Sequence, residues 1–129
     1  MSEALLDTSV VIDPPADESG LPEECAISAI TVAEIHKGVL VAPSRAEHEA
    51  RLALLAEVEA SFAALPLDTP AARILGRYMA DAKRRRLDTG ERLRVRDAII
   101  AATAEANGLT VYTRDEDFRR FGASCAVIG

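Results

Sequence analysis

The sequence contains no tryptophan, only two cysteines and no long run of hydrophobic residues. Two cysteines are too few for a disulfide framework, and Cys25 and Cys125 each lie in an apolar stretch, so we expect free, buried thiols. A bilayer-spanning helix needs about 20 apolar residues, and a secretion signal needs a basic region before an apolar one. Neither pattern is present, and the sequence therefore predicts a cytoplasmic protein.

Basic residues are absent from the first quarter of the chain, where no Lys or Arg precedes Lys37 although eight acids do. The whole chain has 15 basic and 21 acidic residues and a net charge of −6, which is the wrong sign for general electrostatic binding of nucleic acid. The segment KRRRLDTGERLRVR, from Lys83 to Arg96, nevertheless holds seven basic residues against two acids. We therefore expect one local basic patch on an acidic protein.

The length of 129 residues suits one domain, residues 1–129, with a core of its own. Apolar patterns, prolines and a closing Gly108 predict alternating strands and helices along the chain. The expected strands are 4–7, 25–30, 65–68, 109–113 and 124–128, and the expected helices are 9–13, 31–42, 44–65, 70–86, 95–107 and 115–121. This alternation is typical of a three-layer α/β/α sandwich with a mostly parallel central sheet.

Four acids fall where such a fold binds ligands. Asp7 closes the first expected strand and Asp115 follows the 109–113 strand, whereas Glu34 and Asp97 each lie near the start of a helix. In a parallel sheet the strand C-termini and the following helix N-termini share one edge, so we expect Asp7, Glu34 and Asp115 to meet there. Asp97 joins them if its helix crosses that edge.

Each acid also has an ordinary structural interpretation. Asp7 and Asp115 are suited to capping the short helices that follow them, and Asp97 is suited to complementing a helix dipole. Glu34 stands three residues after Thr31, which is the spacing of a capping box. Taken singly, these interpretations are favoured, and the functional hypothesis depends on all four acids sharing one edge.

Converging carboxylates repel each other unless a cation neutralises them. Oxygen ligands favour Mg²⁺ or Mn²⁺, and the sequence lacks the Cys and His spacing that zinc prefers. Because carboxylate-bound Mg²⁺ binds phosphate oxygens, the pattern indicates phosphodiester hydrolysis by metal-activated water. A histidine base is then unnecessary, and we expect no catalytic role for His36 or His48.

Four segments, LLDTSVVID, SAITVAEI, RDAIIAATA and VYTRDEDF, resemble in order and spacing the motifs of PIN-domain ribonucleases, and most of all the VapC-type toxins of toxin–antitoxin pairs. The resemblance covers nearly the whole chain. It implies that Asp7, Glu34, Asp97 and Asp115 hold Mg²⁺ or Mn²⁺, with Asp117 as an auxiliary acid. It also implies supporting polar roles for Thr8 and Thr113, cleavage of RNA to 5′-phosphate and 3′-hydroxyl ends, a homodimer, and inhibition by a cognate VapB-type antitoxin.

The basic residues have two open interpretations, as RNA contacts or as solvated charges. For the 83–96 segment RNA binding is favoured, because seven basic residues exceed what a helix end needs. Aromatic residues make up only 4% of the chain, so base stacking is poorly supported and a structured RNA is the expected substrate. The resemblance to VapC-type toxins implies that this RNA is tRNA, rRNA or mRNA. The candidate substrate contacts are Thr8, Thr113, Lys37, Arg84, Arg85, Arg86, Arg94 and Arg96.

Other α/β proteins with acids at strand ends fit less well. A receiver-like signalling domain needs an acidic pair after the first strand, but Asp7 is followed by Thr8 and Ser9. A haloacid-dehalogenase-type phosphatase needs an acid two residues after its nucleophilic Asp, and that position is Ser9. A non-catalytic PIN-like binding module remains the other hypothesis.

Overall fold

Five short strands form one sheet in the order β3-β2-β1-β4-β5, and every neighbouring pair is parallel. The structure is a computed structural model that describes residues 3–89 and 93–128, with the backbone alone for residues 86–89. Its central strand, β1, pairs Leu5 with Ala26 on one side and with Val111 on the other. The strands are β1 (Ala4–Leu6), β2 (Cys25–Ser28), β3 (Ala63–Leu65), β4 (Thr110–Thr113) and β5 (Cys125–Val127).

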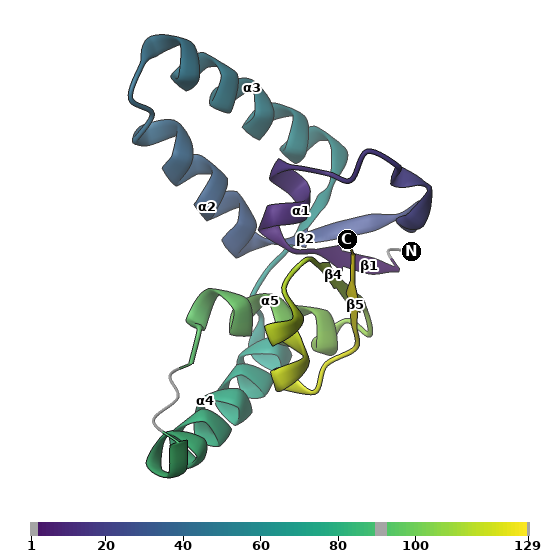
Figure 1. The fold of residues 1–129 in the computed structure, drawn as a ribbon, viewed down its shortest axis with the longest axis vertical. Coiled ribbons are helices and arrows are strands. Elements are labelled where there is room, and N and C mark those ends of the chain that lie inside the picture. The colour runs from purple at the N-terminus through teal and green to yellow at the C-terminus, as the bar shows by residue number, and fades with distance from the viewer. Residues whose placement is uncertain (1–2, 90–92, 129) are drawn as a thin grey trace.

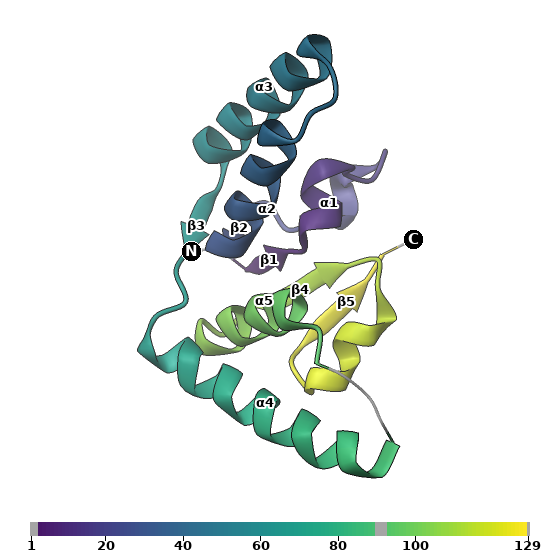
Figure 2. The same cartoon turned by 90° about the vertical axis from the view of Figure 1, so that its left-hand side faces the viewer.

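Helices cover both faces of this sheet, as Figures 1 and 2 show. On one face lie α1 (Thr8–Ile12), α2 (Ala29–Leu40) and α3 (Arg45–Ser61), with α2 and α3 forming a hairpin that projects beyond the sheet. On the other face lie α5 (Val95–Ala106), which packs on the sheet, and α4 (Thr69–Thr89), which packs on α5. Two 3₁₀ helices, η1 (Glu18–Gly20) and η2 (Glu116–Phe121), complete the described elements. The expected three-layer α/β/α sandwich is confirmed.

Successive residues of a strand pack into two separate hydrophobic cores, because side chains alternate between the faces of a strand. Leu5 packs with α5 and Phe118, whereas its neighbour Leu6 packs with α1, α2 and α3. On the face that α5 covers, this helix buries mainly alanines, such as Ala98, Ala101 and Ala102, which favour helix and let it approach the sheet closely. Gly108 adopts φ +66° just after this helix, so a residue without a Cβ suits the turn into β4.

Several predicted boundaries were wrong. The third strand is Ala63–Leu65 and not 65–68, and the preceding helix ends at Ser61 rather than near Leu65. In this strand Ala63 lies opposite Ala26 and Leu65 lies opposite Ser28 of β2. Because alanine has no preference for strands, the pairing with β2 determines where the strand forms. The helix after β2 begins at Ala29 and not at 31, because Ser28 is the N-cap and its hydroxyl accepts from the backbone N–H of Ile30 (3.2 Å).

The helix predicted for 70–86 extends from Thr69 to Thr89, which shortens the loop before α5. Residues 90–92 of that loop lie outside the described part of the chain. None of the helices in the described ranges has the length and apolar content that a membrane crossing requires.

Candidate active site

The predicted acids lie around the carboxyl ends of β1 and β4. Asp7 directly follows β1, and Asp115 comes two residues after Thr113, the last residue of β4. Asp97 is in the first turn of α5, and Glu34 is in the second turn of α2, which follows β2. Contacts among these elements, described next, bring all four acids into one polar region at this edge of the sheet.

Asp7 is nearly buried, with 8% of its surface exposed, and hydroxyl groups hold its carboxylate. Its Oδ2 accepts hydrogen bonds from Thr113 Oγ1 (2.9 Å) and Ser9 Oγ (3.0 Å). Asp7 occupies the N-cap position of α1, but its side chain makes no capping hydrogen bond. The carboxylate is therefore oriented by neighbouring side chains and not by the helix that follows it.

Thr113 links two of the acids. Its hydroxyl donates to Asp7 and accepts from the backbone N–H of Asp115 (3.0 Å), and the side chain is fully buried. Because a β-branched side chain at the end of a strand has few rotamers, this hydroxyl is held in place by the backbone of β4. The end of β4 thus fixes the distance between Asp7 and Asp115.

Glu34 is held from two sides. Its Oε1 accepts from Thr8 Oγ1 (2.8 Å), which also bonds Thr31 Oγ1 (2.9 Å), and its Oε2 accepts from Arg96 Nη1 (3.1 Å). The capping-box interpretation is wrong, because Ser28 is the N-cap of α2 and Thr31 lies within the helix. Glu34 instead turns toward α1 and the start of α5.

The negative charges of neighbouring acids act on Asp97, and that of Asp7 acts more strongly than that of Asp115. Burial and the negative charge of Asp7 raise the pKa of Asp97 above its ordinary value, while Arg94, whose Nη1 is 3.5 Å from Asp97 Oδ2, acts in the opposite direction. Asp115 adds a smaller repulsion. Asp7 and Asp115 are therefore near enough to disfavour the ionised form of Asp97.

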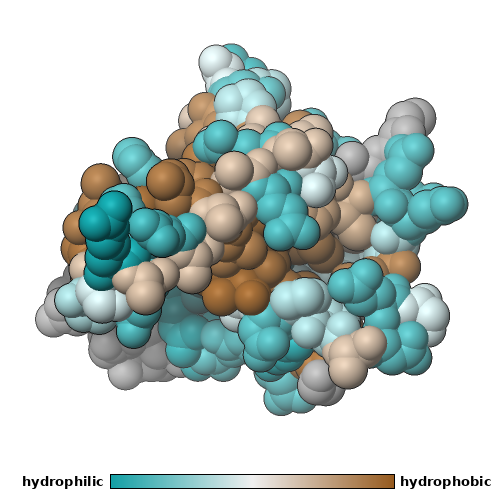
Figure 3. Space-filling view, turned by 90° about the horizontal axis from the view of Figure 1, so that it is seen from above, coloured by the Kyte–Doolittle hydropathy of each residue, from teal (hydrophilic) through white to brown (hydrophobic). Residues whose placement is uncertain are grey.

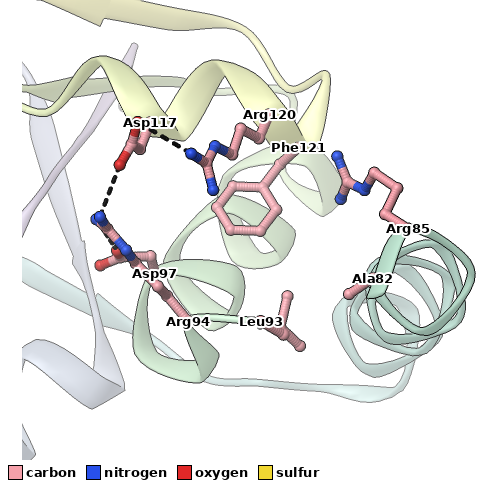
Figure 4. Close-up of a pocket in the computed structure, with 8 residues that line it drawn as sticks. All are labelled: Ala82, Arg85, Leu93, Arg94, Asp97, Asp117, Arg120 and Phe121. Carbon is pink, nitrogen blue, oxygen red and sulfur yellow. Dashed lines mark hydrogen bonds and ion pairs between the residues drawn. The ribbon is translucent and has the colours of Figure 1, made fainter. Parts of the chain in front are cut away.

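Asp115 and Asp117 share one arginine. Arg94 donates from Nη1 to Asp115 Oδ2 and from Nη2 to Asp117 Oδ2, both at 2.6 Å, and Figure 4 shows its guanidinium reaching from beside Asp97 toward Asp117. Asp115 also caps η2, since its Oδ1 accepts from the backbone N–H of Asp117 (2.9 Å), as its structural interpretation predicted. This backbone bond and Arg94 lower the pKa of Asp115.

The donor set is chemically suited to a hard divalent cation, because its oxygens are carboxylate oxygens and the charges of Asp7 and Asp115 act unfavourably on Asp97. Among residues 3–89 and 93–128, however, no three His, Cys, Asp or Glu side chains already converge closely enough to hold an ion. Asp115 and Asp117 are instead hydrogen-bonded to the guanidinium of Arg94.

The predicted basic segment is divided between two places. Arg94 and Arg96 contact the acids, whereas Arg84 pairs with Asp81 on the exposed surface of α4 (2.8 Å). Arg85 lines a small cavity of about 30 Å³ between α4 and η2, and Figure 4 shows it across this cavity from Arg94. The side chain of Arg86 lies outside the described part of the structure, and Lys37 is exposed on α2, one turn after Glu34.

Neither histidine contacts an acid of the site in any described interaction. His48 on α3 bonds through Nδ1 to the carbonyl of Val39 (3.0 Å), which ties the α2–α3 hairpin, and His36 is exposed. Sequence reasoning missed Ser9, Thr31 and Arg120, whose Nη2 is 3.7 Å from Asp117 Oδ1. Only Ser9 carried a usable signal, as a hydroxyl residue two positions after a candidate acid.

The fold and the site together define an α/β protein with a cluster of carboxylates at the carboxyl edge of a parallel sheet. Within that class, the chain belongs to the PIN-domain family, whose model matches residues 4–124.

Two curated relatives have names that say more than the family description does. Ribonuclease VapC5 of Mycobacterium tuberculosis is 35% identical over 127 residues, covering 95% of this chain and 90% of that protein. Toxin FitB of Neisseria gonorrhoeae is 35% identical over 124 residues, covering 86% of each. The crystal structure of VapBC-5 from M. tuberculosis, a member of the VapBC family of toxin–antitoxin systems, matches with a TM-score of 0.78 and 36% identity over 99% of this chain and 98% of that one. The resemblance to VapC-type proteins is confirmed.

Proposed function

We propose that this protein is a metal-dependent endoribonuclease and the toxin of a toxin–antitoxin pair. The observation that carries the proposal is the gathering of Asp7, Glu34, Asp97 and Asp115 at one sheet edge, in a chain whose relatives are named as a ribonuclease and a toxin. The proposal treats residues 1–129 as one domain.

The acids would hold Mg²⁺ or Mn²⁺, with Asp7 and Asp97 the most central and Asp117 auxiliary. The bound cation supplies a Lewis acid that polarises the scissile phosphate and makes water a better nucleophile at neutral pH. The chain contributes orientation: Thr113 and Ser9 fix the Asp7 carboxylate, and Thr8 fixes Glu34. Thr8 and Thr113 therefore act through the acids, and we assign them positioning roles rather than contacts with RNA.

The substrate is RNA, held along the phosphate backbone by basic side chains next to the acidic site. Arg85 and Arg94 line the cavity between α4 and η2 from opposite sides (Figure 4), and Arg84 and Lys37 are exposed. Backbone contacts of this kind do not read sequence, so the shape of a structured RNA directs cleavage.

The decisive experiment incubates the purified chain with total cellular RNA in Mg²⁺, in Mn²⁺ and in EDTA, and then maps the cut ends. We expect discrete cuts with 5′-phosphate and 3′-hydroxyl ends that need the metal and are lost in Asp7→Asn. Arg45→Gln, which removes an exposed charge paired only with Glu49 in the described contacts, is the matched control and keeps full activity. Cuts that persist in EDTA or in Asp7→Asn would identify a contaminating nuclease and contradict the proposal.

The partner we propose is an antitoxin that presents an amphipathic, basic segment. A groove of about 820 Å³ runs between α1, the 14–24 loop and the C-terminal half of α3. Apolar residues such as Val11, Leu54 and Phe62 line it, and its charged lining residues are all acidic: Glu18, Glu23, Glu24 and Glu57. An apolar floor with an acidic rim suits a helix with apolar and Lys or Arg residues.

Co-expression with the protein encoded by the neighbouring gene tests this assignment. We expect a stable complex that protects RNA from cleavage, and we expect Leu54→Glu to weaken the complex without changing cleavage by the free chain. Exposed Leu52→Glu, on the same helix but outside the groove lining, is the control. Equal effects of both variants on the complex would show that the partner does not bind in the groove.

A homodimer is the remaining proposal. Seen from above the view of Figure 1, hydrophobic residues gather in the middle of the surface (Figure 3). Exposed large hydrophobic residues near the α2–α3 connection include Leu40 and Val41, at 69% and 63%. Light scattering at several concentrations tests this: we expect twice the mass of 13.8 kDa, and a monomer at all concentrations contradicts it.

A further inference from the structure

Arg94 makes more contacts with the acidic site than any other described cation. It stands at the N-cap position of α5, where its side chain makes no capping bond. One guanidinium donates to Asp115 and to Asp117 at 2.6 Å each and lies 3.5 Å from Asp97. A single planar group thus serves three carboxylates that come from two elements, α5 and η2 with its cap.

These contacts occupy the atoms that a metal would need. Asp115 Oδ1 is already bonded to the backbone of Asp117 and its Oδ2 is bonded to Arg94, so each oxygen of this carboxylate has a donor. A carboxylate oxygen has more than one lone pair, but a divalent cation beside Asp115 Oδ2 would meet the positive charge of the guanidinium and share that oxygen with it. The two cations therefore compete for Asp115.

We propose that Arg94 is the built-in counter-cation of the acidic site, and that binding of Mg²⁺ or Mn²⁺ requires its guanidinium to leave Asp97, Asp115 and Asp117. This inference rests on the proposed function, because it concerns the metal that function needs. Arg94 acts through the acids as a positioning residue that sets metal affinity. Its side chain is 52% exposed, so release into solvent needs no rearrangement of the core.

The neighbouring arginine does not share this role. Arg96 is two residues away and equally basic, but its contact with the acids is the hydrogen bond to Glu34 Oε2, and Thr8 still holds the other oxygen of that carboxylate. Loss of Arg96 leaves Asp97, Asp115 and Asp117 still bound by Arg94. The two arginines therefore differ in how strongly they oppose a divalent cation.

Calorimetric titration of the full chain with MnCl₂ alone, without RNA, tests the proposal. Because coupling between two sites commonly changes affinity 5- to 150-fold, we expect Arg94→Gln to bind Mn²⁺ at least about fivefold more tightly than the wild type. Arg94→Lys should lie between the two, since lysine keeps the charge and loses the two-pronged contact. Arg45→Gln removes the same charge on α3, and we expect it to stay within about twofold because distant charges are screened.

Thermal unfolding separates this role from a purely structural one. Without metal, Arg94→Gln should unfold at a lower temperature than wild type, because the acids lose their counter-charge. With saturating Mn²⁺ that difference should shrink or reverse, since the metal then replaces the guanidinium. A purely structural role would give the same deficit with and without Mn²⁺.

The outcomes are distinguishable. Equal or weaker Mn²⁺ binding by Arg94→Gln, with clear binding by wild type, overturns the role of Arg94 and leaves the proposed function intact. Absence of Mn²⁺ binding in both proteins overturns the metal-dependent function as well. Binding that survives in Asp97→Asn with Asp115→Asn would place the ion elsewhere and overturn the inference.

Discussion

Asp7 and Asp115 lie at the ends of neighbouring strands, yet the chain holds them by opposite means. Asp7 is nearly buried and is bonded by the uncharged hydroxyls of Thr113 and Ser9. Asp115 is 41% exposed and is bonded by Arg94 and by the backbone of Asp117. Neutral donors orient a carboxylate and leave its charge available, whereas an arginine cancels much of that charge. The comparison indicates that Asp7 is ready for a cation and Asp115 must first be released.

The largest expected effect follows from Asp7→Asn. The amide keeps the size of the side chain and removes the charge that no arginine offsets among its described contacts. We expect RNA cleavage to fall by more than about 100-fold, as when one charged group that stabilises a transition state is removed. Asp115→Asn should cost less, because Arg94 already offsets its charge. A larger loss in Asp115→Asn, measured by single-turnover cleavage, would reverse the comparison.

Thr113→Val tests the link between the two acids. Valine keeps the shape and removes the hydroxyl, which leaves the backbone N–H of Asp115 without its acceptor. We expect cleavage to fall about 10- to 100-fold, as for residues that orient metal ligands, and the free energy of unfolding to fall by about 1–3 kcal/mol.

Thr110→Val is the control on the same strand, because its hydroxyl bonds Ser124 at the far end of β4 (2.8 Å). Activity of this variant should stay near that of the wild type. Equal losses of activity in the two variants would show that β4 tolerates neither valine, and Thr113 would lose its specific role.

Neutralising Arg84, Arg85 and Arg86 together to Gln tests the basic end of α4. Binding is measured by fluorescence anisotropy with labelled RNA in the Asp7→Asn background, so that the RNA stays intact. Each lost phosphate contact flattens the salt dependence of log K by about 0.7, and we expect a total change of about 2. Arg45→Gln with Arg73→Gln should leave the slope unchanged. An unchanged slope in the triple variant would remove this end of α4 from RNA binding.

The smallest expected effects are on stability, and they have opposite signs. Burial and Asp7 raise the pKa of Asp97 above 3.8, so between 3.8 and that raised pKa the folded state binds more protons and stability falls as pH rises. The backbone of Asp117 and Arg94 lower the pKa of Asp115, so between that lowered pKa and 3.8 stability rises with pH.

Urea unfolding in EDTA from about pH 3 to about pH 7 measures both signs. Relative to wild type, Asp97→Asn should gain free energy of unfolding as pH rises, and Asp115→Asn should lose it. Changes of the same sign in both variants would show that Arg94 does not distinguish the two acids.

The fold was predictable from local patterns where residues carry their own signal. Leu5, Leu6, Ala26 and Ile27 lie in short apolar runs, and these runs are the two central strands of the first half. The strand Ala63–Leu65 was misplaced because nothing in its residues favours a strand, and only its pairing with β2 selects it. Thr31 likewise looked like an N-cap, but Ser28 ended the strand first.

The acids of the site could be predicted from the sequence, but the side chains that contact those acids could not. Residue spacing predicted that Asp7, Glu34 and Asp115 share one edge, since parallel topology brings those ends together, and Asp97 was expected there only if its helix crossed that edge. The division of the basic segment was not predictable, because Arg94 contacts residues 21 and 23 positions away in the sequence. The spacing of three between Arg94 and Asp97 was the one local sign of that contact.

The hydrogen bonds that join Thr31, Thr8 and Glu34 all run in one direction. A hydroxyl has a single proton, and Thr8 gives its proton to the carboxylate of Glu34. In the Thr8–Thr31 contact, Thr31 must then be the donor, so the protons run one way, from Thr31 through Thr8 to Glu34. Thr31 and Glu34 belong to α2 while Thr8 belongs to α1, so this chain of hydrogen bonds runs from α2 to α1 and back to α2. Serine at position 31 would preserve this one-way chain and valine would break it, although residue 31 touches no acid in the described contacts.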